Sequence, residues 1–211
     1  MKFLTFKKGI ADFPIFSTSH LNSLVRDGRV LRNQLTKWQN RGLVVKLRRG
    51  LYVLGASERR IQPSRFFLAN QLHQPSYVST EYAMAFYDLI PERVTDVTSV
   101  SSKKTATFKN EFGQFIYQHI KADCFTGYEI MADENGFDYF IAEPEKALID
   151  FIYLNSSLFD MAPMEIFESL RLQNLGSLSM QKIKKYARLC NRQRILTITN
   201  ALLDFLKKVP S

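Results

Sequence analysis

The chain has 211 residues, of which 45% are hydrophobic and 13% aromatic, ample for a packed core in one or two domains. Its formal net charge of +9 favours an anionic partner such as nucleic acid. Lys7, Lys8 and Asp12 interrupt the N-terminal apolar residues, and no window approaches the ~18 apolar residues of a transmembrane helix. We therefore expect a cytoplasmic protein without a signal peptide, membrane span or membrane partner.

The first 54 residues predict three helices followed by a hairpin. The first helix is expected over residues 2–11, and the second over residues 17–25, with Ser17 as its N-cap. Asp27 and Gly28 then form the turn that leads into the third helix.

The third helix, expected over residues 29–40, separates apolar from polar side chains. Leu31, Leu35 and Trp38 recur at helical spacing and predict its buried face. The other faces can bond DNA, because Asn can pair with adenine, Arg or Lys with guanine, and all of them with phosphate. The candidate DNA-binding residues on this helix are Arg29, Arg32, Asn33, Thr36, Lys37 and Asn40. The alternatives are a solvated helix face and, for Arg29, a cap on the preceding turn.

A basic hairpin is expected directly after this helix. Gly42 stops the helix, and residues 43–54 predict two strands joined by a tip at Arg48-Arg49-Gly50. Arginine at such a tip can reach backbone phosphates or a narrow minor groove. The remaining candidate DNA-binding residues are Lys46, Arg48 and Arg49. Helices and hairpin together predict a winged helix-turn-helix domain over residues 1–55 that binds double-stranded DNA.

Positive charge is concentrated near the two ends of the chain. Residues 26–60 hold ten Lys or Arg against two acidic residues, a net charge of +8, and residues 182–211 carry +7. Residues 61–181 sum to −8. A polyanion would therefore meet the N-terminal part and, as a further option, the C-terminal end.

Residues 56–62 predict a polar, basic linker, and residues 63–211 an α+β domain. Helices are expected over residues 63–73, with Pro63 at the N1 position, and over residues 80–89. β-Branched and aromatic residues then predict several strands up to residue 142, with a hairpin turn at residues 133–136. The expected fold class is α+β: the winged helix is followed by an antiparallel sheet with flanking helices and a helical C-terminal end.

An amphipathic helix is expected from Pro144 to Asn155, and further helical segments at residues 163–172, 179–191 and 194–209. Apolar spacing assigns its core face to Ala147, Leu148, Phe151 and Ile152. That assignment leaves Glu145, Lys146 and Asp150 facing solvent or forming ion pairs along the helix.

The last two helices are basic and are candidates for partner binding. Their cations could contact an acidic protein surface, RNA or only water, because Lys-rich helices are common without any partner. The candidate partner-binding residues are Lys182, Lys184, Lys185, Arg188, Arg192 and Arg194.

The sequence favours no enzymatic function. The histidines His20, His73 and His119 lie in separate elements, and Cys124 and Cys190 lie far apart in the sequence without metal-ligand spacing. Pro144 occupies the position at which a nuclease carboxylate–Lys motif ending at Lys146 would need an acidic residue. There is also no Gly-rich phosphate loop followed by Lys-Ser/Thr. We therefore expect no catalytic residue, no metal and no cofactor.

Three segments resemble the AbiEi family of antitoxins, the antitoxin half of type IV toxin–antitoxin systems, and related transcriptional regulators. They are GLVVKLRRGLYVL at residues 42–54, with its R-x-G-x-Y pattern, PSYVSTEYAMAFYDLIP at residues 75–91 and AEPEKALIDFIYL at residues 142–154. They occur in the family's order and together span most of the chain.

The resemblance implies two roles. The N-terminal domain would bind inverted repeats in the protein's own promoter, as a monomer or a weak dimer, and repress the operon. The C-terminal domain would antagonise a cognate nucleotidyltransferase-like toxin, directly or indirectly. The alternatives are a stand-alone winged-helix regulator without a toxin, and an RNA-binding or nucleotide-processing protein.

Overall fold

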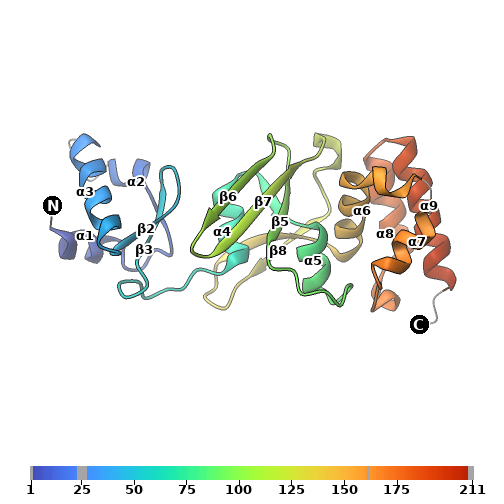
Figure 1. Ribbon diagram of the computed structural model, residues 1–211, viewed down its shortest axis with the longest axis horizontal. Coiled ribbons are helices and arrows are strands. Elements are labelled where there is room, and N and C mark those ends of the chain that lie inside the picture. Colours follow the sequence, from blue (N-terminus) through green and yellow to red (C-terminus); the bar gives the residue numbers. More distant parts are fainter. Residues whose placement is uncertain (1, 23–27, 161, 209–211) are drawn as a thin grey trace.

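The computed structural model describes residues 2–22, 28–160 and 162–208, and the fold is α+β. A small sheet with helices lies at the N-terminal end, a larger sheet in the middle, and a group of helices at the C-terminal end (Figure 1). The helices are α1 (Phe3–Ile10), α2 (Thr18–Asn22), α3 (Gly28–Asn40), α4 (Arg65–Leu72), α5 (Thr80–Phe86), α6 (Pro144–Leu154), α7 (Pro163–Ser169), α8 (Met180–Leu189) and α9 (Gln193–Lys208). The strands are β1 (Phe16–Ser17), β2 (Val44–Arg48), β3 (Leu51–Leu54), β4 (Ser76–Val78), β5 (Val97–Ser101), β6 (Ala106–Asn110), β7 (Gly113–His119), β8 (Tyr128–Ala132) and β9 (Asp138–Ala142).

The N-terminal part packs α1, α2 and α3 with an antiparallel sheet of order β1-β3-β2. Its core is aromatic: the ring of Phe6 from α1 stacks on Trp38 of α3 with centroids 4.6 Å apart. Phe16 of β1 stacks on Tyr52 of β3 at 5.8 Å. Side chains from every element of this part therefore meet in one small core.

The predicted first helix, third helix and hairpin are confirmed by α1, α3 and the β2–β3 pair. Ser17 directly precedes α2, which begins at Thr18, and so occupies the predicted N-cap position; it is also the second residue of β1. A two-residue strand is too short to produce an alternating pattern, so the sequence did not predict it. The remainder of the predicted second helix, up to Val25, and Asp27 of the predicted turn lie outside the described residues.

The larger sheet is mixed, with the order β6-β7-β5-β4-β9-β8. The prediction of an antiparallel sheet was wrong at two places, since β5 pairs with β7 and β4 with β9 in parallel. The β6–β7 hairpin folds back so that β7, not β6, lies beside β5. Local residue patterns identify strands but not their neighbours, and parallel partners are by necessity distant in the sequence.

Helices α4 and α5 pack on this sheet, and α6 links α5 to the C-terminal helices α8 and α9. The predicted Pro63 start of α4 is displaced by two residues, because the Ser64 hydroxyl accepts a hydrogen bond from the Phe67 N–H and caps the helix. Ser79 occupies the N-cap position of α5 without capping it, since its hydroxyl donates to Asp150 instead.

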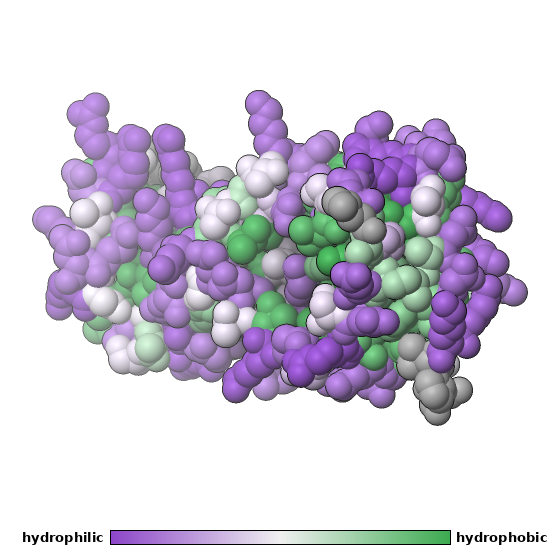
Figure 2. Space-filling view, turned by 45° about the vertical axis from the view of Figure 1, so that its right-hand side comes forward, coloured by the Kyte–Doolittle hydropathy of each residue, from purple (hydrophilic) through white to green (hydrophobic). Residues whose placement is uncertain are grey.

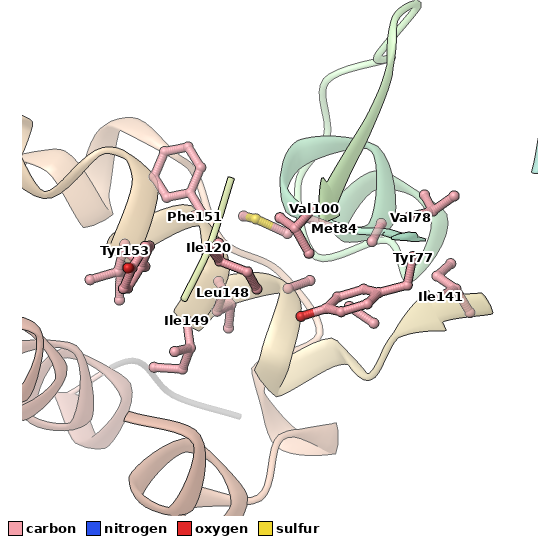
Figure 3. Packing of buried hydrophobic residues seen from close by; sticks show 14 of the residues in the cluster. Tyr77, Val78, Met84, Val100, Ile120, Ile141, Leu148, Ile149, Phe151 and Tyr153 are labelled. Atoms are coloured by element: carbon pink, nitrogen blue, oxygen red, sulfur yellow. The ribbon is translucent and has the colours of Figure 1, made fainter. Parts of the chain in front are cut away.

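Helix α6 confirms one expected arrangement and excludes the other. Its boundaries and its apolar face are as expected, and Lys146 and Asp150 form an ion pair along the helix. Glu145, Lys146 and Asp150 do not face solvent, however: they are 4%, 0% and 0% exposed. The helix is enclosed by α5, α8 and α9, so no side of it is left for solvent. Figure 3 shows its residues Leu148, Ile149 and Phe151 in one packed interior with Tyr77 of β4.

The β2–β3 hairpin contacts the larger sheet as well as α3. Leu47, Leu51 and Val53 are buried in the same hydrophobic cluster as the core of the C-terminal part. The Asn110 amide of β6 donates to the Leu47 carbonyl at 3.4 Å. The predicted linker, residues 56–62, is also anchored, because Arg59 forms an ion pair of 2.6 Å with Glu111.

Candidate nucleic-acid interface

Helix α3 presents one buried and one exposed face, as its sequence predicts. Leu31, Leu35 and Trp38 are 1%, 1% and 6% exposed, and they attach the helix to the small core. The predicted DNA-binding residues on the opposite face are all exposed: Arg29, Arg32, Asn33, Thr36, Lys37 and Asn40. Their spacing places them along one stripe of the helix. Thirteen helical residues span about 20 Å, long enough to follow a stretch of major groove.

Hydrogen bonds within α3 orient part of this stripe. Arg32 Nε donates to the Gly28 carbonyl at 3.2 Å, which holds the guanidinium near the start of the helix. The Thr36 hydroxyl donates to the Arg32 carbonyl at 3.0 Å, so its oxygen is left as an acceptor toward solvent. Both side chains are thus partly positioned before any ligand arrives.

A shallow cleft of about 320 Å³ joins α3 to the hairpin. The predicted residues Arg32, Thr36, Asn40 and Lys46 line it, together with Gln39 and Tyr52. Gln39 was not among the predicted site residues, although it lies three positions after Thr36 and could have been found by extending the same stripe. Its amide donates to the Leu35 carbonyl at 3.2 Å.

The two arginines at the hairpin tip have different surroundings. Arg49 is exposed, as the prediction requires, whereas Arg48 is only partly accessible and its Nε is buried. Burial lowers the pKa of His73, the residue that follows α4, and the positive charges of Lys103 and Arg48 lower it further. The structure therefore places Arg48 beside the C-terminal part and Arg49 at the free end of the hairpin.

Several of the predicted partner-binding cations already have intramolecular partners. Lys182 forms an ion pair with Glu143 at 2.6 Å. Arg194 binds Asp160 and donates to the Ser156 carbonyl at 2.7 Å. The remaining predicted residues are Lys184, Lys185, Arg188 and Arg192, all exposed, with Arg192 lying over the Tyr153 ring at 4.4 Å and Lys185 over the Tyr186 ring at 5.6 Å.

A buried polar cluster lies between β4 and α6, and the sequence did not predict it. Asp150 accepts hydrogen bonds from Ser79 Oγ at 2.7 Å and from the Tyr77 hydroxyl at 3.0 Å, and it pairs with Lys146. Burial and the neighbouring Asp150 carboxylate raise the pKa of Tyr77 well above its usual value. Because these side chains are enclosed, we assign the cluster to stability rather than to chemistry on a substrate.

The buried thiols of Cys124 and Cys190, distant in the sequence, lie next to this cluster. A hydrogen bond between them lowers the pKa of Cys124 and raises that of Cys190. Both cysteines are free, and they form part of the packed interior.

Two of the three histidines, although far apart in the sequence, lie at the same cleft. His73 and His119 line one open cleft with Lys103 and Lys104, and His119 Nδ1 lies 3.1 Å from the Lys103 carbonyl oxygen. The side chain of His20 lies outside the description. Among the described residues no group of three His, Cys, Asp or Glu is placed to hold a metal ion.

In the part of the chain that the structure describes, no helix combines the length and the apolar character needed to cross a membrane. Hydrophilic side chains predominate at the N-terminal end of the face shown in Figure 2, with smaller hydrophobic patches between them. This is the end that carries α3 and the hairpin.

No protein-family model matches the chain, and no curated protein matches it.

Proposed function

We propose that this chain is a DNA-binding antitoxin of a type IV toxin–antitoxin system, which represses its own operon through a winged helix-turn-helix at residues 1–55. One observation carries the DNA-binding part of the proposal: α3 buries Leu31, Leu35 and Trp38 and exposes an unbroken stripe of Arg, Asn, Thr and Lys. A helix of this kind can enter the major groove, where such side chains distinguish base pairs.

The hairpin supports the same function. Lys46 lies in the cleft shared with α3, and Arg49 is exposed at the tip, so that both can approach the phosphates that flank the groove. The bases would be read by Asn33, Thr36 and Asn40, with Arg32 and Lys37 reaching either guanine or phosphate. Each inverted repeat would receive one copy of the chain, as two monomers or as a weak dimer.

The antitoxin part rests on the resemblance of residues 75–91 and 142–154 to AbiEi antitoxins. In the structure these two segments pack against each other, since Asp150 of the second accepts hydrogen bonds from Tyr77 and Ser79 of the first. If the C-terminal part has the domain of AbiEi antitoxins, the two segments that resemble the family should pack together, and this contact supports the proposal.

DNA binding is tested by fluorescence anisotropy with a labelled duplex from the region upstream of the gene and with a scrambled duplex. The full chain should prefer the upstream duplex, and the logarithm of its affinity should fall with the logarithm of salt concentration with a slope of roughly −4.5, if the five exposed Arg and Lys of α3 and the hairpin contact phosphate. The variant Asn33→Ala/Lys37→Ala should lose the preference. A matched control, Asn200→Ala/Lys208→Ala on α9, replaces exposed residues of the same types and should not. Equal binding of both duplexes by the wild-type chain contradicts the proposal.

The antitoxin role is tested separately by co-expression with the product of the adjacent reading frame. The full chain should rescue growth that this product arrests, and so should Asn33→Ala/Lys37→Ala, because the rescue is assigned to the C-terminal part. Full-length variants are preferred to a chain that lacks residues 1–55, because that deletion would remove Leu47, Leu51 and Val53 from the core that they share with the C-terminal part. If the product of the adjacent reading frame does not arrest growth, the function that remains is that of a stand-alone regulator. Nuclease or nucleotidyltransferase activity of the pure chain would contradict both regulatory functions.

A further inference from the structure

A second concave site lies on the C-terminal part, away from the α3 surface. It is a cleft of about 420 Å³ between the end of α4, the start of β4 and the outer strands β8 and β9. This volume is within the range of small-ligand pockets. The cleft has an aromatic side, formed by Phe125, Tyr128 and Phe140, and a polar side, to which α4 and β4 contribute.

The aromatic side forms a corner. The rings of Tyr128 and Phe140 are nearly perpendicular, at 87° with centroids 5.6 Å apart, and Phe125 lies 5.6 Å from Tyr128 on its other side. Tyr77 stacks on Tyr128 at 4.7 Å and supports it. Tyr128 and Phe140 are each 37% exposed, so ring surface remains accessible to a ligand.

The polar side offers two oxygens that can accept hydrogen bonds. Gln74 donates to Gln71 Oε1 at 3.2 Å, which leaves the Gln74 carbonyl oxygen able to accept. Ser76 is 6% exposed, and within the described part of the chain its hydroxyl has no hydrogen-bond partner. A buried hydroxyl without a partner is costly, and a ligand in this cleft would relieve that cost.

The electrostatics of the cleft disfavour anions. Among its described lining residues the charged one is Asp138, at the edge of β9. Residues 122–145, which supply the aromatic side, contain seven Asp or Glu and no Lys or Arg, and of these Glu143 is paired with Lys182. Phosphate and carboxylate ligands would therefore be repelled, whereas a cation would be attracted both by this charge and by the faces of the rings.

We infer that this cleft binds a guanidinium group. A guanidinium is planar, so it can stack on Tyr128 or Phe140 while its N–H groups donate to Asp138, Gln74 and Ser76. An alkylammonium has the same charge but lacks a flat face, and a neutral nucleobase could stack and donate a hydrogen bond to Asp138 but lacks the positive charge. The guanidinium could belong to an arginine of a partner protein or to a free arginine-like metabolite.

The inference is tested by saturation-transfer NMR and chemical-shift titration of the full chain with ethylguanidinium, butylammonium and adenosine. Ethylguanidinium should bind saturably and more tightly than butylammonium. Capped arginine amide and free arginine then distinguish the sources: binding of the capped form assigns a protein arginine, and binding of free arginine alone assigns a metabolite. Tighter binding of adenosine, or saturable binding by none of these probes, would overturn the inference.

Variants locate the site. Asp138→Asn should weaken ethylguanidinium at least about tenfold, because it removes a charge-assisted hydrogen bond. Phe140→Leu should weaken it about threefold through loss of a ring face. Glu134→Gln is the matched control: it removes the same charge from the β8–β9 turn, outside the lining residues, and should leave the affinity within about twofold. Near-ultraviolet circular dichroism verifies that each variant is folded. Equal affinities of Asp138→Asn and Glu134→Gln would place the binding elsewhere and overturn the assignment.

Discussion

Lys146 and Asp150 lie one turn apart on α6 and form an ion pair in which both side chains are completely buried. The second carboxylate oxygen of Asp150 accepts from Ser79 and Tyr77, so both oxygens of this buried carboxylate have partners. Lys146 also lies 5.5 Å from the centroid of the Tyr77 ring. The cluster thereby ties α6 to β4 and to the start of α5.

Removing one member of the Lys146–Asp150 pair should destabilise the fold by much more than the intact pair stabilises it. Asp150→Asn leaves the Lys146 ammonium buried without its counter-charge, and we expect it to lower the free energy of unfolding by about 3–5 kcal/mol. Adding Lys146→Met should recover part of this loss, because the uncompensated charge is gone while Ser79 and Tyr77 keep an acceptor. Urea unfolding followed by circular dichroism measures both.

The matched control for that series is Asp204→Asn in the exposed Lys207–Asp204 pair, whose side chains are more than half exposed. It should change the free energy of unfolding by less than about 1 kcal/mol. Similar losses at Asp150 and Asp204 would show that burial does not dominate the energetics of the α6 pair.

Helical periodicity was enough to predict α3 and its two faces, because Leu31, Leu35 and Trp38 report burial through spacing alone. The same rule left Asp150 facing solvent or in an ion pair along the helix; the ion pair is present, but the burial of Asp150 was not predicted. Its partners Tyr77 and Ser79 are 73 and 71 residues away in the sequence, and a carboxylate is buried only where such partners exist. A Lys and an Asp four apart within an otherwise apolar helix were the available signal.

The guanidinium cleft could not be predicted for a related reason. It combines the end of α4 with β8 and β9, and their proximity depends on the parallel pairing of β4 with β9. Asn70 shows how specific that arrangement is: its side-chain amide accepts from the N–H of Phe140 and donates to the carbonyl of Phe140. Neither contact can be recognised from the local sequence.

Asn33 should be a base-reading residue of the proposed DNA site. It is exposed in the middle of the α3 stripe, and a bidentate contact to adenine would be worth about 1–3 kcal/mol of discrimination at one base pair. We expect Asn33→Ala to relax sequence preference at that position and to leave affinity for random DNA unchanged. Competition among singly substituted operators measures this, with Asn200→Ala as the control. A uniform loss on every sequence would instead assign Asn33 to the phosphate backbone.

Substitutions of the two arginines at the hairpin tip should change the salt dependence of DNA binding by different amounts. Arg49→Ala should weaken binding to all sequences and flatten the log–log salt dependence by roughly 0.9, the effect of one lost phosphate contact. Arg48→Ala should change this slope less, because its guanidinium lies toward the C-terminal part. Affinity measured over a series of salt concentrations distinguishes them, and an equal change in slope for the two variants would contradict the separation.

His73 should make stability depend on pH. Burial and the positive charges of Lys103 and Arg48 lower its pKa, while a hydrogen bond at the Lys104 backbone opposes them. The folded chain therefore binds this proton less readily than the unfolded chain, whose histidine titrates near about 6.5. The favourable contribution of neutral His73 is complete above that pH and is lost as the pH falls toward the lowered pKa.

His73→Gln, which cannot titrate, should therefore flatten the decline in the free energy of unfolding on the acid side of about pH 6.5. Urea unfolding of wild type and variant at a series of pH values measures the difference between them. That difference should be constant in the range around pH 8, where the imidazole is neutral in both states, and should change only as the pH is lowered. An identical slope for wild type and variant across the acid range would show that His73 is protonated equally easily in the folded and unfolded chains.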